Sequence, residues 1–417
     1  MSVQKPCGIN DWICPEPLAP ARFESIRRRM VLEYCKWDPQ VGDISTLAPF
    51  PMVIPATVAR ELSLLAEGLA AETESAEREL LSRPDLIRRL GLPRAIQQVL
   101  LDESIPLTAV AARVIRFDFH PTAEGWRISE ANSDVPGGYT ESSHFPRLMA
   151  EHWPCYHSAG NPLATFADAI TWHLGEHRHV GLLAAPGFVE DQQVIRCIAN
   201  ELHTRKWTAV FGRPSQLEWN SGSASLRLSN RLAPSSVIIR FFQGEWLARL
   251  RDRQSWRHLF RGGNTPVCNP GLSVLSESKR FPLVWNELKT PLPHWRSLLP
   301  KTRDPRSVHW HRDSEWLLKG AFGNNGDEVA DRHLQTRRDW RKTQWSVRLH
   351  PRQWAAQRRF AALAIATPLG DMYPCLGVYT VNGRACGIYG RMSAKPFIDY
   401  AAIDVAILVN NDDGDRG

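Results

Sequence analysis

Residues 116–138 read RFDFHPTAEGWRISEANSDVPGG, and the predicted fold is built outward from this stretch. Apolar Ile115 and Phe117 alternate with polar residues, which is the period of a β-strand with one apolar face. Residues 121–125 (PTAEG) have the composition of a turn, and residues 126–132 return as a second strand. The stretch therefore predicts a β-hairpin.

Polar side chains share one face of this hairpin. With the turn centred near Ala123, Arg116 lies across from Glu130, Asp118 is a diagonal neighbour, and Asn132 shares their face by parity. Facing or diagonal residues on paired strands are roughly 5–8 Å apart. Two carboxylates and a carboxamide oxygen could thus hold one ion, and an all-oxygen donor set favours Mg²⁺ or Mn²⁺ over zinc. The alternative is a surface hairpin with an ordinary Arg–Glu pair.

The composition is that of an ordinary soluble globular protein. The 417 residues have room for two or three domains, with 43% hydrophobic and 23% charged content. The N-terminal residues lack the apolar core of a signal peptide, and the late apolar run 401–409 is too short to cross a bilayer. Eight dispersed cysteines without a CxxC pair give neither a disulfide framework nor a zinc ribbon. We expect a cytoplasmic protein without a membrane partner.

The chain is moderately basic, with a formal net charge of +7. Basic residues concentrate in 249–261 and in 332–359, where tryptophans interleave with them. A nucleic-acid surface is one interpretation of this pattern. The modest charge and the lack of a nucleic-acid motif favour instead a solvated face or a field for an anionic substrate.

Periodicity predicts helices and a β-α-β unit elsewhere. Helical patterns cover 57–71, with Thr57 as N-cap, then 77–90 with a break at Pro84, then the residues after Pro93. In the β-α-β unit we expect a strand at 180–185, a helix at 192–204 and a second strand at 207–211. A further buried strand is expected at 236–242. This order predicts a small Rossmann-like unit, although no GxGxxG motif accompanies it.

Two lysines stand where they could bind phosphate. Residues 269–288 predict a loop leading into a helix with Lys279 near its start. Residues 315–319 predict a strand that ends in Lys319, just before the glycine-containing loop 320–329 (GAFGNNGDEV). A strand-end lysine beside a glycine-rich loop is one way to cradle polyphosphate, and the alternative is a solvated lysine.

The C-terminal part is rich in predicted strands. Residues 359–366, 373–381 and 384–391 have strand patterns, and Asn382-Gly383 predicts a hairpin turn. Arg391 ends the last of these strands, where its side chain could meet an anionic group.

Taken together, these motifs resemble the glutathionylspermidine synthase group of ATP-grasp ligases, over about residues 37–409. The resemblance rests on five motifs: RFD at 116–118, EAN at 130–132, SKRFPLVW around Lys279, Lys319 before its loop, and GIYGR ending at Arg391. The Glu-x-Asn motif precedes both lysines, which is the order of the circularly permuted branch.

The resemblance implies a mixed α/β (α+β) fold: a circularly permuted ATP-grasp with a Rossmann-like pre-ATP-grasp unit and helical N-terminal elements. The expected division is a helical N-terminal region (1–105), the metal-binding hairpin part (106–160), the pre-ATP-grasp unit (161–268) and the ATP-binding lobes (269–417).

The resemblance also implies roles for individual residues. Mg²⁺ would be held by Asp118, Glu130 and Asn132, the transferring phosphoryl group by Arg116 and Arg391, and ATP by Lys279, Lys319, Gly323, Gly326 and Gln357. In the glycine loop, Asn324 and Asn325 stand where relatives often carry a charged residue, so loop closure and acceptor choice could differ here.

The implied activity is ATP-dependent ligation of a small-molecule or peptide carboxylate to an amine through an acyl phosphate, with ATP and Mg²⁺ as cofactors. The loop 320–329 would close over the nucleotide as a lid. No amidase-like Cys/His unit is evident, so we expect the ligase activity alone. The alternatives are a non-catalytic nucleotide-binding relative and a phosphotransferase with a hydroxyl acceptor.

Overall fold

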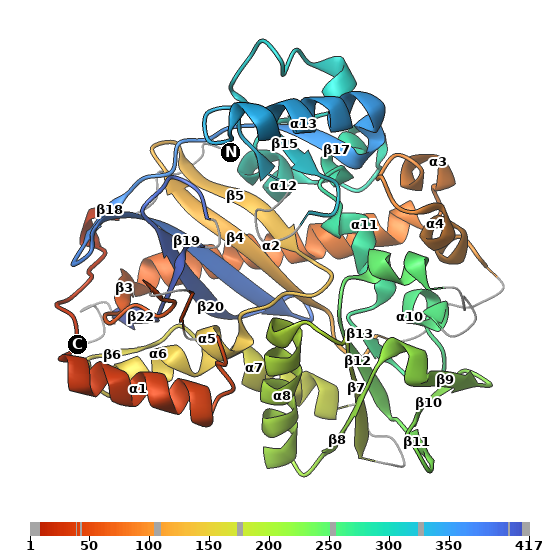
Figure 1. Ribbon diagram of the computed structural model, residues 1–417, viewed down its shortest axis with the longest axis horizontal. Coiled ribbons are helices and arrows are strands. Elements are labelled where there is room, and N and C mark those ends of the chain that lie inside the picture. The colour runs from red at the N-terminus through yellow and green to blue at the C-terminus, as the bar shows by residue number, and fades with distance from the viewer. Residues whose placement is uncertain are drawn as a thin grey trace.

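A central antiparallel sheet carries the hairpin (Figure 1). The computed structural model describes residues 9–38, 40–41, 44–103, 110–172, 178–250, 256–323, 329–398 and 401–410. The six strands of the sheet, in spatial order, are β21 (Ile403–Val405), β20 (Arg384–Ser393), β19 (Gly370–Val381), β4 (Val114–Thr122) and β5 (Gly125–Asn132), with β18 (Ile365–Thr367) paired to β19. Residues more than 250 positions apart in the sequence thus become neighbours in one sheet.

The predicted hairpin is confirmed, but its register differs from the expected one. Arg116 faces Asn132 and Asp118 faces Glu130, because strand pairing continues to Thr122 and the pairing shifts beyond Asp118. The shift leaves Ser129 without a partner, as in a β-bulge, and so moves Glu130 directly opposite Asp118. The four polar residues still share one face.

The opposite face of the hairpin is part of the main core. Phe117 and Phe119 are fully buried, and Phe117 makes an edge-on contact with Trp295. The long helix α2 (Ala56–Leu80) runs behind the sheet and packs on β19 and β20 (Figure 1). This burial of one hairpin face leaves the other face for the site.

A parallel sheet forms the Rossmann-like unit, which lies at the lower right of Figure 1. Its strand order is β13 (Val267–Cys268), β12 (Val237–Phe241), β7 (His179–Ala184) and β8 (Thr208–Gly212), and every pair is parallel. Helix α8 (Val189–Thr204) connects β7 to β8 and packs on both, next to α7 (Pro162–Thr171). The predicted β-α-β order is confirmed. A small antiparallel sheet follows it, made of β9 (Leu217–Asn220), β10 (Ser223–Arg227) and β11 (Leu232–Pro234).

A smaller lobe, built from residues 293–358, lies next to the hairpin at the top of Figure 1. Its sheet has the order β14 (Thr302–Arg303), β17 (Trp354–Arg358), β15 (Trp316–Gly320) and β16 (Val329–Ala330), with α12 (Pro293–Leu298) and α13 (Arg337–Leu349) beside it. The basic Trp-containing segment forms α13, a helix that buries Val347 and exposes Trp345. The expected strand ending at Lys319 is confirmed as β15.

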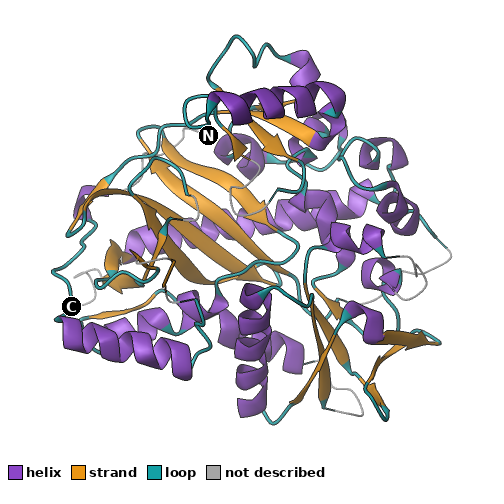
Figure 2. Cartoon of the chain, viewed as in Figure 1, coloured by secondary structure: helices purple, strands orange, loops and turns teal. Residues whose placement is uncertain are grey.

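The N-terminal part adds helices and three short strands. Its elements are α1 (Pro20–Leu32), β1 (Gln40–Val41), β2 (Ile44–Ser45), β3 (Met52–Pro55), α2, α3 (Pro84–Ile87) and α4 (Arg94–Leu100). Strand β3 pairs in parallel with β22 (Ile407–Asn410), which also pairs with β6 (Tyr156–Ser158). Helices α5 (Tyr139–Ser143) and α6 (Phe145–Ala150) lie near this sheet (Figure 2).

Several predicted boundaries are wrong. Helix α2 begins at Ala56 after Pro55, without a side-chain cap, so Thr57 is not the N-cap. Residues 269–288 form only the one-turn helix α11 (Val274–Glu277) and 3-10 turns, and Lys279 follows α11. A strand was expected at 359–366, whereas β17 ends at Arg358 and β18 starts at Ile365. Within the described ranges, no helix has both the length and the apolar character needed to span a membrane.

Candidate functional site

Four of the predicted residues meet on the polar face of the central sheet. Arg116 donates from Nε to Asp118 Oδ1 (2.7 Å) and from Nη2 to Oδ2 (3.0 Å). Arg391, on β20, reaches the same Oδ2 at 3.0 Å, and Asn132 donates to it at 3.2 Å. Strand β20 continues beyond Arg391 to Ser393, so this arginine lies inside the strand and not at its end as predicted.

Position 377 has to be glycine for this cluster to form. Gly377 lies on β19 directly opposite Asp118. A Cβ atom there would lie 2.8 Å from Arg116 Cδ and 3.0 Å from Asp118 Oδ1, closer than van der Waals contact allows. The missing side chain leaves the space in which the guanidinium and the carboxylate meet.

Asp118 is a buried anion. Its side chain is 1% exposed, and burial alone would raise its pKa. The positive charges of Arg116 and Arg391 outweigh that effect and lower the pKa of Asp118 to about 2. Three of the four donated hydrogen bonds converge on Oδ2 and only one reaches Oδ1. Among the described residues, Oδ1 therefore keeps one of its two lone-pair sites for a further ligand.

Glu130 joins the hairpin to the first predicted lysine. Lys279 Nζ lies 3.2 Å from Glu130 Oε2 and 3.2 Å from Glu277 Oε1. Burial is the largest single influence and raises the pKa of Glu130, but the positive charges of Lys279, Lys319 and Arg391 together outweigh it, so the pKa of Glu130 is lowered. Glu277, two residues before the lysine, also accepts from the backbone N–H of Ser133 and of Asp134 and so ties the end of the hairpin to this loop.

Lys319 reaches the same place from the small lobe. Its Nζ donates to the backbone oxygen of Ser129 at 2.9 Å. Burial and the nearby charge of Lys279 lower its pKa to about 8, against the opposing effect of Glu130. Both predicted lysines thus contact strand β5 at its bulge, Lys279 at Glu130 and Lys319 at Ser129.

Two further residues predicted to bind the nucleotide, Gln357 and Gly323, lie in the small lobe. Gln357, on β17, is buried, donates to Thr302 Oγ1 at 3.1 Å, and lines a small cavity together with Glu130, Lys279 and Lys319. Gly323 is partly buried at the end of the described part of its loop.

Part of the expected lid and part of the expected ATP site fall on residues outside the described ranges. Gly326, with Asn324 and Asn325, lies outside the described residues, as does the middle of the loop expected to close as a lid, residues 324–328.

The small cavity has a volume of about 20 Å³, which holds about one water molecule. A cavity of this size is too small for a nucleotide, so ATP does not fit between Lys279, Lys319 and Gln357 in this conformation.

The donor chemistry of the hairpin fits a hard cation. Within the described ranges, no three His, Cys, Asp or Glu side chains are grouped as a metal site. The predicted set consists of two carboxylates and one carboxamide, and both carboxylates have lowered pKa values. Mg²⁺ commonly takes one or two protein carboxylates and completes its coordination with water and phosphate. The donor types of Asp118, Glu130 and Asn132 therefore suit Mg²⁺, and Oδ1 of Asp118 accepts only one hydrogen bond in the described part of the chain.

His120 is a site residue that the sequence analysis missed. It lies on β4 two positions after Asp118, and its Nε2 is 3.1 Å from Ser129 Oγ. Burial is the main reason that its pKa falls to about 4, so the imidazole is neutral at physiological pH. The alternation that placed Arg116 and Asp118 on one face would also have placed His120 there.

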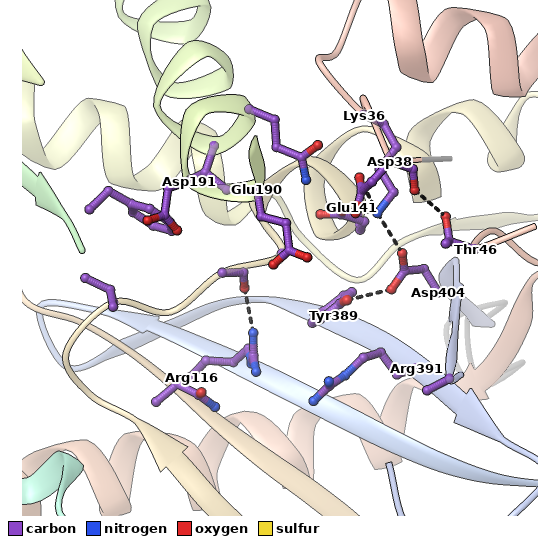
Figure 3. Close-up of a pocket in the computed structure, with 18 of the residues that line it drawn as sticks. Lys36, Asp38, Thr46, Arg116, Glu141, Glu190, Asp191, Tyr389, Arg391 and Asp404 are labelled. Atoms are coloured by element: carbon purple, nitrogen blue, oxygen red, sulfur yellow. Dashed lines mark hydrogen bonds and ion pairs between the residues drawn. The ribbon is translucent and has the colours of Figure 1, made fainter. Parts of the chain in front are cut away.

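A larger cavity of about 320 Å³ opens on the other side of Arg116 and Arg391 (Figure 3). Helix α8 contributes Glu190 and Asp191 to its wall, opposite the strands that carry the two arginines. Polar groups therefore line both sides of a space next to the arginine–aspartate cluster.

The N-terminal part completes this cavity. Lys36 is 3% exposed, and its Nζ lies 2.6 Å from Glu141, 3.1 Å from Asp404 and 3.3 Å from Asp38. Asp404 also accepts a 2.5 Å hydrogen bond from Tyr389. These residues come from distant parts of the chain, so no local pattern could have identified them.

Tyr389 connects that network to the arginines. Its ring centroid is 5.2 Å from the guanidinium carbon of Arg116 and 5.4 Å from that of Arg391. An aromatic face at this distance stabilises a cation. Lys36, Asp404 and Tyr389 thus form a chain of contacts that leads from the buried lysine to the two arginines.

The sequence profile described as glutathionylspermidine synthase preATP-grasp matches residues 56–409. The chain belongs to this family. Its fold is the mixed α/β, circularly permuted ATP-grasp expected from the motif order, and the family supports a synthetase or ligase function.

Solved structures agree with the family assignment at the level of the fold. A glutathione synthetase-like effector from Globodera pallida, in apo form, superposes with a TM-score of 0.59 at 13% identity, over 93% of this chain and 96% of that one. A protein described as a γ-glutamylcysteine synthetase from Methylobacillus flagellatus KT gives a TM-score of 0.39 at 12% identity, over 78% of this chain and 82% of that one. No curated protein matches the sequence.

Proposed function

We propose that this family member is an ATP-dependent carboxylate–amine ligase that forms an amide bond through an acyl phosphate. The observation that carries the proposal is the meeting of the Arg116–Asp118–Arg391 cluster with Glu130, Lys279 and Lys319. These groups lie between the small lobe and the 320 Å³ cavity. A nucleotide on one side and a carboxylate on the other would share the two arginines.

Phosphoryl transfer depends mainly on positioning and charge. Lys279 and Lys319 would bind ATP phosphates from the small-lobe side. The buried guanidinium groups of Arg116 and Arg391 would stabilise the charge on the phosphoryl group as it passes to the substrate carboxylate. When bound at Asp118, Glu130 and Asn132, Mg²⁺ would neutralise phosphate charge.

The second step needs an amine and a dry site. The acyl phosphate hydrolyses readily, so water must be kept out while the amine attacks. The small volume beside Lys319 is consistent with lobes that close tightly once the nucleotide is bound. The amine would reach the acyl carbon from the 320 Å³ cavity, on the far side of the arginines from the nucleotide.

The proposal is tested by trapping the activated carboxylate. The protein, Mg-ATP and hydroxylamine are incubated with glutathione and with a panel of peptides, amino acids and dicarboxylates, and hydroxamate and ADP are measured. A parallel panel replaces hydroxylamine with spermidine, alkyl diamines and amino acids. ADP with a hydroxamate indicates an acyl phosphate, a stable phosphoester indicates a phosphotransferase, and no turnover indicates a non-catalytic nucleotide-binding protein.

Two variants test the assignment of the site. Lys319→Met and Glu130→Gln should each lower hydroxamate formation by about 10²–10³-fold, because each removes a charge that acts on the transferring phosphoryl group or its counter-ion. Lys342→Met in the exposed helix α13 is the matched control and should retain wild-type activity. Wild-type turnover in either site variant would refute the assignment.

A further inference from the structure

The positive charge of the chain is concentrated in the small lobe. Residues 293–358 contain 14 Lys and Arg residues against seven Asp and Glu residues, and this excess equals the formal net charge of +7 of the whole chain. The rest of the chain is therefore balanced in charge. The candidate site uses Lys319 alone among the cations of the lobe, which leaves most of this charge without a function.

Helix α13 presents three of these cations on its outer face. Figure 1 shows α13 along the top of the molecule, on the outside of the small lobe. Arg338, Arg341 and Arg348 are exposed. Together with Trp345 they recur at intervals of three and four residues, which places all four on one face of the helix. The opposite face packs on the lobe through the buried Val347.

Two large apolar side chains are exposed among these arginines. Trp345 is 62% exposed and Leu349 is 67% exposed, and residues four apart are neighbours on a helix surface. Single exposed apolar side chains are ordinary, whereas adjacent ones with a polar rim are typical of interaction surfaces. We refer to Arg338, Arg341, Trp345, Arg348 and Leu349 as the α13 surface.

The three arginines of the α13 surface form no ion pair within the described ranges. Other cations of the lobe do: Lys342 lies 3.2 Å from Asp339, and Arg358 lies 2.8 Å from Asp313. Lys342 is therefore not counted in the surface. Like charges held on one helix face repel each other, and an anionic partner would relieve that repulsion.

Charge complementarity thus favours an anionic partner, and the apolar pair indicates which kind. A nucleic acid would meet the arginines and stack on Trp345, but it offers no apolar region that buries the aliphatic side chain of Leu349. A bilayer with anionic lipids offers both kinds of contact. Its headgroups present phosphate and carboxylate groups to the arginines, and the acyl chains just below them bury Trp345 and Leu349.

We propose that the α13 surface docks this protein on a lipid bilayer that contains anionic lipids. In the docked state α13 lies along the interface, with its three arginines among the headgroups and its two apolar side chains at the acyl boundary. The expectation of no membrane partner rested on the lack of a spanning segment in the sequence, and this kind of docking needs none. The proposal is independent of the ligase function, because no residue of the α13 surface belongs to the candidate site.

Co-sedimentation with lipid vesicles tests the proposal. The protein is mixed with vesicles of phosphatidylcholine alone, and with vesicles in which about one third of the lipid is phosphatidylserine. We expect at least about tenfold stronger binding to the anionic vesicles, and weaker binding as the salt concentration rises, because salt screens the headgroup charge. Arg338→Gln/Arg341→Gln should weaken that binding about 20-fold, and Trp345→Ala/Leu349→Ala about tenfold.

Matched controls remove the same kinds of side chain from α1 and from the end of α7, in the lower half of Figure 1. Arg22→Gln/Arg28→Gln removes equal charge from exposed positions, and Leu32→Ala/Trp172→Ala removes two exposed apolar side chains. Both controls should bind the anionic vesicles within about twofold of the wild type, because neither changes the α13 surface.

The outcomes decide between the possible partners. Equal binding to both kinds of vesicle, no binding to either, or an equal loss in the surface variants and the controls overturns the proposal. Binding of a single-stranded RNA oligonucleotide that needs the α13 surface, without binding of vesicles, overturns it in favour of a nucleic-acid surface. Thermal melts of the surface variants should match that of the wild type, so that a selective loss of vesicle binding supports the proposal.

Discussion

The arginine–aspartate cluster makes a quantitative prediction about stability. Replacing Asp118 with Asn removes a buried negative charge and leaves Arg116 and Arg391 facing each other without it. An Asn side chain offers one acceptor oxygen and turns an N–H donor towards guanidinium groups that are themselves donors. We therefore expect a less stable protein at neutral pH.

Two physical arguments give the magnitude. A carboxyl whose pKa falls from 3.8 to about 2 on folding contributes about 2 kcal/mol to the free energy of unfolding at pH 7. Breaking a buried ion pair by removing one partner typically costs about 3–5 kcal/mol. We expect Asp118→Asn to lower the free energy of unfolding by about 3 kcal/mol.

The pH dependence has a definite sign. Because the folded-state pKa of Asp118 is depressed, its contribution is complete above pH 4 and is lost as the pH falls towards 2. About 1 kcal/mol of the wild-type advantage over Asp118→Asn should be gone at pH 3.

Urea unfolding followed by tryptophan fluorescence at pH 7 and at pH 3 measures both effects. Asp371→Asn, an exposed position on β19, is the control and should change the free energy by less than about 0.5 kcal/mol. An Asp118→Asn protein as stable as the wild type at pH 7 would refute the reasoning, and so would a difference that is the same at both pH values.

Two further predictions follow from the same region. Gly377→Ala should push Arg116 away from the carboxylate and lower hydroxamate formation at least tenfold, while overpacking costs about 1–3 kcal/mol of stability; unchanged activity would show that the cluster tolerates the methyl group. Lys36→Met should destabilise the protein by about 3–5 kcal/mol, because it leaves the buried carboxylates of Glu141 and Asp404 unneutralised; a thermal melt identical to that of the wild type would contradict the ion-pair assignment.

Short-range patterns predicted the local elements well. The hairpin, the β-α-β unit and the strand ending near Lys319 are all present, because each has a side-chain period that one segment of chain carries by itself. The Asn382-Gly383 turn is present for a similar reason: both residues have positive φ, at 50° and 77°, as this kind of hairpin turn requires.

Predictions that depended on packing were less successful. Nothing in the sequence marked the bulge at Ser129, which decides that Glu130 and not Ser129 faces Asp118. Residues 269–288 had apolar content suited to a helix, yet they form short turns. Their side chains, such as Phe281 and Trp285, pack against Trp295 from another element.

Alternation along the chain made it predictable which side chains lie on the same side within each strand, such as Arg116 with Asp118 and Glu130 with Asn132, whereas the bulge decided which sides of the two strands coincide. Tertiary structure alone decided what lies opposite the polar face of the hairpin. Lys279, Lys319 and Arg391 arrive from segments far along the chain, and Lys36 arrives from before the hairpin. The alternation of side chains is a property of the local backbone. The contacts of these distant residues with the hairpin follow instead from the pairing of distant strands and the burial of distant apolar surfaces, which no single stretch of sequence encodes.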